Sequence, residues 1–168
     1  MSEVNVFGVE LAVDEGDPEG YQGVGYARLG PLLGAEKLGM TVYELPPGTS
    51  NCPYHYEFPD EEWVIVLSGR LTLRTPDGET ELGPWDVACF PPGEAGAHKL
   101  TNRGTEPLRL AMLSTKSEAS MAVYPDSISE CHRLKQVFCK AGYATAEYPM
   151  EQNGRLVCSP YGIKAYAQ

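Results

Sequence analysis

The chain has 168 residues, of which 42% are hydrophobic and 21% are charged, as in an ordinary globular domain with a core large enough to fold alone. Its net charge of −10 argues against nucleic acid, whose phosphates attract lysine and arginine, and against an anionic membrane surface. No apolar run approaches the roughly 20 residues of a transmembrane helix, and residues 1–5 lack the basic and apolar regions of a signal peptide. The five cysteines have no C-x-x-C spacing, which favours reduced thiols in the cytoplasm over a disulfide framework.

Short apolar runs separated by glycine and proline turns predict an all-β domain. Residues 1–37 form an acidic, glycine-rich arm, with a candidate edge strand at residues 4–7 and a turn at residues 30–34. Residues 38–125 carry the firm pattern, and the strands predicted there are residues 40–45, 62–67, 71–74, 79–82, 86–90, 97–102, 108–113 and 121–124. Residues 126–168 are expected to be an extension that packs on this unit or on a partner subunit, with a helix within residues 127–142. Many short strands at close intervals indicate a sandwich or a barrel.

Two stretches of the strand region carry candidate functional side chains. Residues 52–63 contain His55, Glu57 and Glu62, and a later stretch ends in His98. Alternate residues of a strand share a face, so His55 and Glu57 point the same way, and His98 points inward because Lys99 needs water. Charged groups beside a core must be paired or bind a metal. We therefore predict that the two stretches meet and that these four side chains hold one divalent metal ion.

Other residues near these stretches have a structural interpretation. Strand alternation predicts that Cys52 faces away from the first histidine, and that Cys89 is a small buried residue. We expect Trp63 and Trp85 to lie in the core or in a dimer contact. Asn102 is expected to hold a turn rather than to touch a substrate.

The same residues resemble the two sequence motifs of the cupin superfamily over about residues 38–114. The first motif is present as Gly48, His55, Glu57, Glu62 and Gly69. The second is present as Gly83, Pro91, Gly93, His98 and Asn102. The resemblance implies a double-stranded β-helix, often dimeric, with metal ligands at His55, Glu57, Glu62 and His98.

The sequence departs from the family pattern in four places. Glu57 stands where the family usually has a second histidine, so the ligand set becomes two histidines and two glutamates. His55 lies one residue further from Gly48 than usual, Gly83 is further from its P-x-G, and His98 follows Gly93 after more residues than usual. The first change bears on which metal is bound, and the other three alter loop lengths.

Cupins include isomerases, oxygenases, decarboxylases, lyases, storage proteins and ligand sensors, so the resemblance does not choose a function. One hypothesis is a metal-dependent enzyme that acts on a small organic molecule in the barrel, with oxygenase or sugar-type isomerase chemistry and Zn, Fe, Mn or Ni as the ion. The alternative is a cupin module that binds a small molecule or a metal without catalysis. Both hypotheses describe a cytoplasmic homodimer that contacts neither nucleic acid nor membrane.

Overall fold

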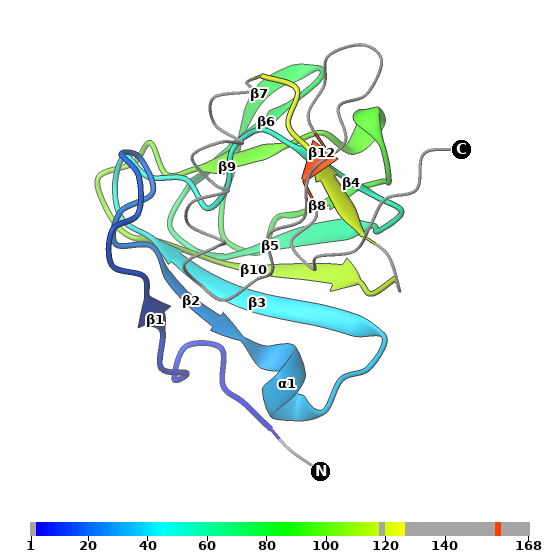
Figure 1. Ribbon diagram of the computed structural model, residues 1–168. Helices are drawn as coiled ribbons and strands as arrows, with labels where there is room; N and C mark the ends of the chain where they lie inside the picture. The colour runs from blue at the N-terminus through cyan, green and yellow to red at the C-terminus, as the bar shows by residue number, and fades with distance from the viewer. Residues whose placement is uncertain (1–2, 118–119, 127–156, 159–168) are drawn as a thin grey trace.

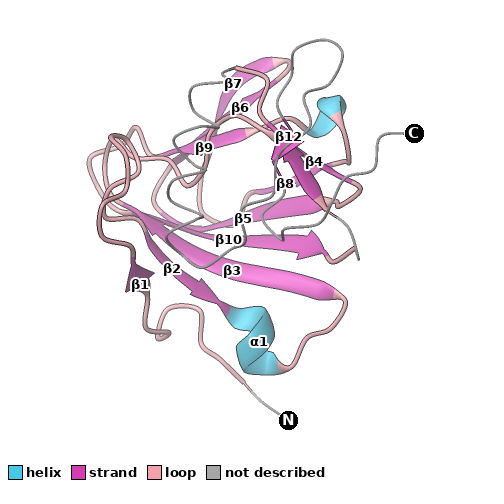
Figure 2. Cartoon of the chain, in the orientation of Figure 1, coloured by secondary structure: helices cyan, strands magenta, loops and turns pink. Residues whose placement is uncertain are grey.

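The structure is a computed structural model that describes residues 3–117, 120–126 and 157–158. Antiparallel strands dominate this part of the chain, and the single α-helix is five residues long (Figure 2). The all-β prediction is therefore confirmed. None of the described helices is long and apolar enough to cross a membrane. The helix expected within residues 127–142 lies outside the described residues.

The largest sheet contains six strands in the order β1-β2-β3-β10-β5-β8. Their bounds are Ala12–Val13 for β1, Gly25–Arg28 for β2, Leu38–Leu45 for β3, Leu108–Thr115 for β10, Glu62–Ser68 for β5 and Val87–Phe90 for β8. Strand β10 lies between β3 and β5, which are far from it in the sequence, so the sheet is held by long-range pairing (Figure 1).

Two three-stranded sheets lie on the other side of the interior (Figure 1). One contains β7 (Gly78–Leu82), β6 (Leu71–Thr75) and β9 (Lys99–Thr101), and the other contains β12 (Val157–Cys158), β11 (Met121–Val123) and β4 (Tyr56–Phe58). Strands β6 and β7 form the hairpin that Pro76 and Asp77 predict, because Thr75 pairs with Gly78 across that turn. All eight strands predicted within the firm region are present, with ends displaced by a few residues.

The core fills the space between the six-stranded sheet and the β7-β6-β9 sheet. Its buried side chains come from alternate positions of facing strands, among them Val64, Val66, Leu71, Leu73, Leu100 and Leu110. A second apolar cluster lies on the outer face of the large sheet, where Leu29, Val42 and Ala111 pack against residues of the N-terminal arm such as Val4 and Val6. The strand alternation of the sequence therefore sets which side chains line the interior.

Two predictions for the arm are wrong. Residues 4–7 form no strand; residues 6–8 are a turn, because the Asn5 carboxamide oxygen accepts hydrogen bonds from the N–H groups of Phe7 and Gly8. The predicted turn at residues 30–34 is largely the helix α1 (Leu29–Leu33), which is capped by Gly34 with a φ of 69°. Pro31 fits there because the first turn of a helix needs no N–H donor, and glycine readily takes the left-handed conformation at the end.

Asn102 holds a turn, as predicted. It is fully buried; its side-chain N–H2 group donates to the carbonyls of Leu45 and Glu106, and its oxygen accepts from the N–H of Gly104. We expect Asn102→Ala to lower the free energy of unfolding by about 3 kcal/mol, because buried groups lose their partners. Urea unfolding measures this. Asn5→Ala is the control, because Asn5 makes two exposed hydrogen bonds, and a comparable loss there would contradict the role of burial.

Candidate metal centre

The two histidines of the predicted site are neighbours in space. His55 and His98 form an antiparallel bridge, with the His55 N–H donating to the His98 carbonyl at 3.0 Å and the His98 N–H donating back at 2.8 Å. Their ring centroids lie 4.7 Å apart, and the two residues are buried, with 6% and 1% of their surface exposed. The prediction that these stretches meet is confirmed.

Main-chain carbonyls orient both imidazole rings. The Nδ1 atom of His55 lies 2.8 Å from the carbonyl oxygen of Pro53, and Nδ1 of His98 lies 2.9 Å from that of Gly96. A carbonyl oxygen only accepts hydrogen bonds, so Nδ1 is the donor in each ring. The Nε2 atoms then carry the lone pairs when the rings are neutral, which is how metal-binding histidines are usually held.

Glu62, at the start of β5, completes a group of three candidate ligands. Its Oε2 atom lies 3.8 Å from Nε2 of His55 and 3.5 Å from Nε2 of His98. One ligand atom from each residue can be chosen so that all three lie within 4.8 Å of one another. Two ligands of one ion lie about 3 to 3.5 Å apart when the bonds are about 2.1 Å long, so small side-chain movements suffice.

Unpartnered polar atoms in this group fit a metal ion. Among the described residues, Oε2 of Glu62 and Nε2 of His98 are buried without a hydrogen-bond partner. A buried polar atom without a partner costs free energy, and a bound cation would remove that cost for both atoms. Two imidazoles with one carboxylate suit Zn, Fe, Mn or Ni.

Glu57 lies beside this group rather than within it. It is on β4, opposite Ala122 of β11, and its Oε2 atom accepts a hydrogen bond of 3.0 Å from the Ser120 hydroxyl. Its carboxylate still influences the charge of His55 and Glu62. Direct ligation by Glu57 stays a prediction, and the geometry also suits contact with a water on the ion.

Sequence reasoning missed Tyr124 as a neighbour of the histidines, whereas it placed Phe90 near the site and turned Cys52 away from it. The ring of Tyr124 stacks on His55 with centroids 5.6 Å apart, and the ring of Phe90 stacks on His98 at 3.7 Å. The Cys52 thiol lies 3.9 Å from the Tyr124 hydroxyl and is close enough to His55 to raise the pKa of that imidazole. The prediction that Cys52 faces away is wrong, because residues 51–54 form bends rather than the strand it assumed.

The three candidate ligands have different protonation tendencies. Burial lowers the pKa of His55, but the Cys52 thiol and then the carboxylates of Glu62 and Glu57 outweigh burial and raise it to about 10. Burial, and then the neighbouring His55, lower the pKa of His98 to about 3. Burial raises the pKa of Glu62 to about 7, although His55 opposes this shift. At neutral pH His98 is therefore neutral, and a proton on His55 competes with a metal ion.

Metal affinity is expected to rise with pH. Binding requires neutral His55 and ionised Glu62, whose pKa values are about 10 and 7, so each ion displaces about one proton at pH 8 and a second one below pH 7. The association constant should then increase about tenfold per pH unit near pH 8 and more steeply near pH 6. Competition with a chromophoric chelator for Zn²⁺ between pH 6 and 8 measures the slope, and an affinity independent of pH would contradict this protonation scheme.

Comparisons with known proteins find one domain family and several solved structures that are similar to this chain. The model of the cupin domain family matches residues 41–114. A sugar phosphate isomerase of the cupin superfamily from Silicibacter pomeroyi is 27% identical, with a TM-score of 0.66, over 74% of this chain and 82% of that one. A candidate sugar phosphate isomerase from Acidithiobacillus ferrooxidans is 30% identical, with a TM-score of 0.58, over 61% of this chain and 65% of that one.

A more distant structure shares the fold. A polyketide cyclase from Streptomyces resistomycificus is 22% identical, with a TM-score of 0.61, over 82% of this chain and 93% of that one. No curated protein matches the chain. Residues 41–114 therefore form a cupin domain, and the fold is the double-stranded β-helix that the sequence motifs predict.

Proposed function

We propose that this cupin is a metal-dependent enzyme that isomerises a small sugar-like substrate with adjacent hydroxyl and carbonyl groups. The observation that carries the proposal is the convergence of three buried ligand atoms, two of which lack a hydrogen-bond partner among the described residues. The likeness to a protein called a sugar phosphate isomerase, at 27% identity, supports isomerisation as the reaction class.

Three residues of the chain would hold the ion through Nε2 of His55, Nε2 of His98 and Oε2 of Glu62. A divalent ion in that position supplies a Lewis acid that polarises a substrate oxygen. The stacked rings of Tyr124 and Phe90 cover the imidazoles and keep water from them. The sequence motifs also assign Glu57 to this ligand set, but its position beside the three ligands supports a role other than ligation.

We assign proton transfer to Glu57. The Ser120 hydroxyl holds one carboxylate oxygen in place, and the other can take a proton from one substrate carbon and return it to the next. One proton is removed and one is restored, so the reaction needs no further reactant. Proton transfer by a side chain held in position typically increases a reaction rate between about 100-fold and 10,000-fold.

The Glu57→Gln variant tests this assignment. We expect it to retain its metal and to lose at least about 100-fold in turnover, because glutamine keeps the shape of the side chain but cannot take up the proton. Metal content by elemental analysis, together with turnover of a panel of aldose and ketose phosphates, measures both effects. The Glu61→Gln variant is the control, because Glu61 binds the indole N–H of Trp63 instead. Loss of the metal in Glu57→Gln would identify Glu57 as a ligand.

Oxygenase chemistry is the second candidate, favoured by the combination of two histidines with one carboxylate, which is the ligand set of non-haem Fe(II) oxygenases. Oxygen uptake by the iron-loaded protein separates the two reactions, because isomerisation consumes no oxygen. Ligand binding without turnover in either assay would instead support the non-catalytic module.

The proposal also covers the organisation of the chain. It comprises an arm at residues 1–37, the cupin unit at residues 38–125 and an extension at residues 126–168, in a cytoplasmic homodimer with a small-molecule ligand. The exposed apolar residues Trp63 and Val87 on the outer face of β5 and β8 support self-association. Light scattering during gel filtration measures the oligomeric state.

A further inference from the structure

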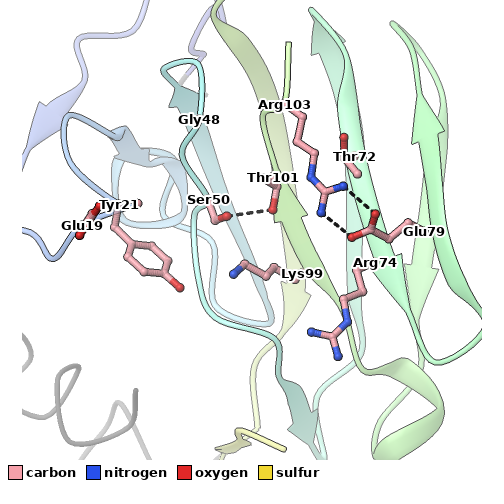
Figure 3. A pocket seen from close by; sticks show the side chains of 11 residues that line it. Glu19, Tyr21, Gly48, Ser50, Thr72, Arg74, Glu79, Lys99, Thr101 and Arg103 are labelled. Carbon is pink, nitrogen blue, oxygen red and sulfur yellow. Dashed lines mark hydrogen bonds and ion pairs between the residues drawn. The ribbon is translucent and has the colours of Figure 1, made fainter. Parts of the chain in front are cut away.

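A polar cavity of about 330 Å³ lies on the outer face of the β7-β6-β9 sheet (Figure 3). Three cationic side chains line it, Arg74, Lys99 and Arg103, which is a notable share of the 13 lysines and arginines in a chain of net charge −10. Hydroxyl groups of Ser50 and Thr101 line it as well.

The cavity is separate from the candidate metal centre. His98, directly before β9, and Leu100 of β9 turn their side chains into the interior, whereas Lys99 and Thr101 lie on the opposite face. Lys99 pairs with Arg74 of β6, and Thr101 pairs with the neighbouring Thr72, so these four side chains share the outer face. The sheet itself therefore lies between the cavity and the histidines.

Ion pairs hold both arginine side chains in place and leave some of their N–H donors unused. Nη1 and Nη2 of Arg103 donate to the two carboxylate oxygens of Glu79 at 2.7 and 2.6 Å (Figure 3). The Arg74 guanidinium binds both carboxylate oxygens of Asp126 and lies 3.9 Å from the centre of the Tyr54 ring. Each pair uses only some of the N–H donors of the guanidinium, so the planes are held in place with donors left over.

Lys99 is the cation best placed to bind a ligand. Its Nζ lies 5.9 Å from the centre of the Tyr21 ring, and its side chain is half-buried between the Ser50–Thr101 pair and Arg74 (Figure 3). The Ser50 and Thr101 hydroxyls lie 2.9 Å apart, and one of them donates to the other. A hydroxyl can both donate and accept, so this pair can also bind a ligand oxygen.

We infer that this cavity is a second ligand site, which takes a small hydroxylated molecule carrying a phosphate group. An ammonium with hydroxyl and guanidinium donors around it is a typical phosphate environment. The carboxylates of Glu19 and Glu79 in the same cavity favour a ligand that also offers hydroxyl donors over a bare anion. The volume is at the lower end of the range for small-molecule pockets.

Calorimetric titration with ribose 5-phosphate, ribose and inorganic phosphate tests the inference. We expect ribose 5-phosphate to bind more tightly than either of the other two. Lys99→Met should weaken ribose 5-phosphate at least about tenfold, because a charge-assisted hydrogen bond is lost. Thr101→Val is a second, nearly isosteric variant and should weaken binding by a smaller factor. The matched control is Lys116→Met, since Lys116 is an exposed lysine that donates to the Ala35 carbonyl outside the cavity.

The same titration with Glu62→Gln protein separates this site from the metal centre. We expect ribose 5-phosphate to bind the cavity unchanged in that variant, even if the proposed metal chemistry fails. Binding that disappears in Glu62→Gln but persists in Lys99→Met would assign the ligand to the histidine site and overturn the inference. Equal affinity for ribose and ribose 5-phosphate, or no saturable binding of any probe, would overturn it too.

Discussion

Glu62→Gln is expected to remove the metal ion from the protein. The amide presents a nearly neutral oxygen or an N–H2 group where the carboxylate oxygen Oε2 lies 3.5 and 3.8 Å from the two imidazoles. Loss of one ligand from a set of three should lower the affinity at least about 100-fold, more than the 10- to 100-fold typical of outer partners. Elemental analysis of protein purified without chelator should then fall from about one ion per chain to a trace.

The His98→Ala variant removes a different ligand and is also expected to lose the metal ion. Since the side chain is buried and stacked on Phe90, this variant also loses packing, and its folding must be checked by circular dichroism. Glu61→Gln and His132→Ala serve as controls, as the carboxylate next in sequence and the remaining histidine of the chain. Full metal content in both Glu62→Gln and His98→Ala would refute the site.

Gly96→Ala is expected to damage both stability and metal binding. A Cβ at residue 96 would overlap the carbonyl oxygen of Pro91 and lie 2.9 Å from its carbonyl carbon, so the backbone of the short helical turn at Glu94–Gly96 must shift. That shift moves the Gly96 carbonyl away from Nδ1 of His98. We expect a loss of about 2 to 4 kcal/mol in stability and a 10- to 100-fold loss in metal affinity.

Gly93→Ala provides the comparison for this effect. Gly93 has a φ of 84° and a ψ of −169°, a region almost confined to glycine, but no atom within 4 Å would meet its Cβ, so the cost is backbone strain of about 1 to 3 kcal/mol. Thermal unfolding and a Zn²⁺ titration of both variants measure the difference. Unchanged metal affinity in Gly96→Ala would show that the carbonyl of residue 96 does not orient His98.

Local sequence patterns predicted the strands and the meeting of the histidines, because both depend on which face of a strand a residue occupies. The Lys99 ammonium needs water, and neighbouring residues of a strand face opposite ways, so the sequence predicted that His98 points inward. The environment of the outer faces was not predictable in the same way. Cys89 does face away from Ala88 and Phe90, but it is exposed rather than buried, because nothing among the described residues covers the outer face of β8.

Contacts between distant segments were also beyond the sequence pattern. Trp85, expected in the core or in a dimer contact, is 71% exposed in the chain. Tyr124 was predicted as the last residue of the strand at residues 121–124 and lies directly after β11, but its stacking on His55 depends on β11 pairing with β4, and no spacing rule gives that pairing. The Cys52 thiol reaches His55 because residues 51–54 form bends. Side chains in a bend do not alternate between two faces as they do in a strand, so the sequence pattern could not predict this contact.

The carbonyls of Pro53 and Gly96 orient the two imidazoles of the candidate centre through the backbone. Every residue type supplies a carbonyl, so the direction in which the two imidazoles point is set by the backbone conformation rather than by hydrogen bonds from neighbouring side chains. Residues that line the interior can therefore be exchanged without turning the rings. A scaffold of this kind can acquire new substrates during evolution while the positions of its metal-binding imidazoles stay the same.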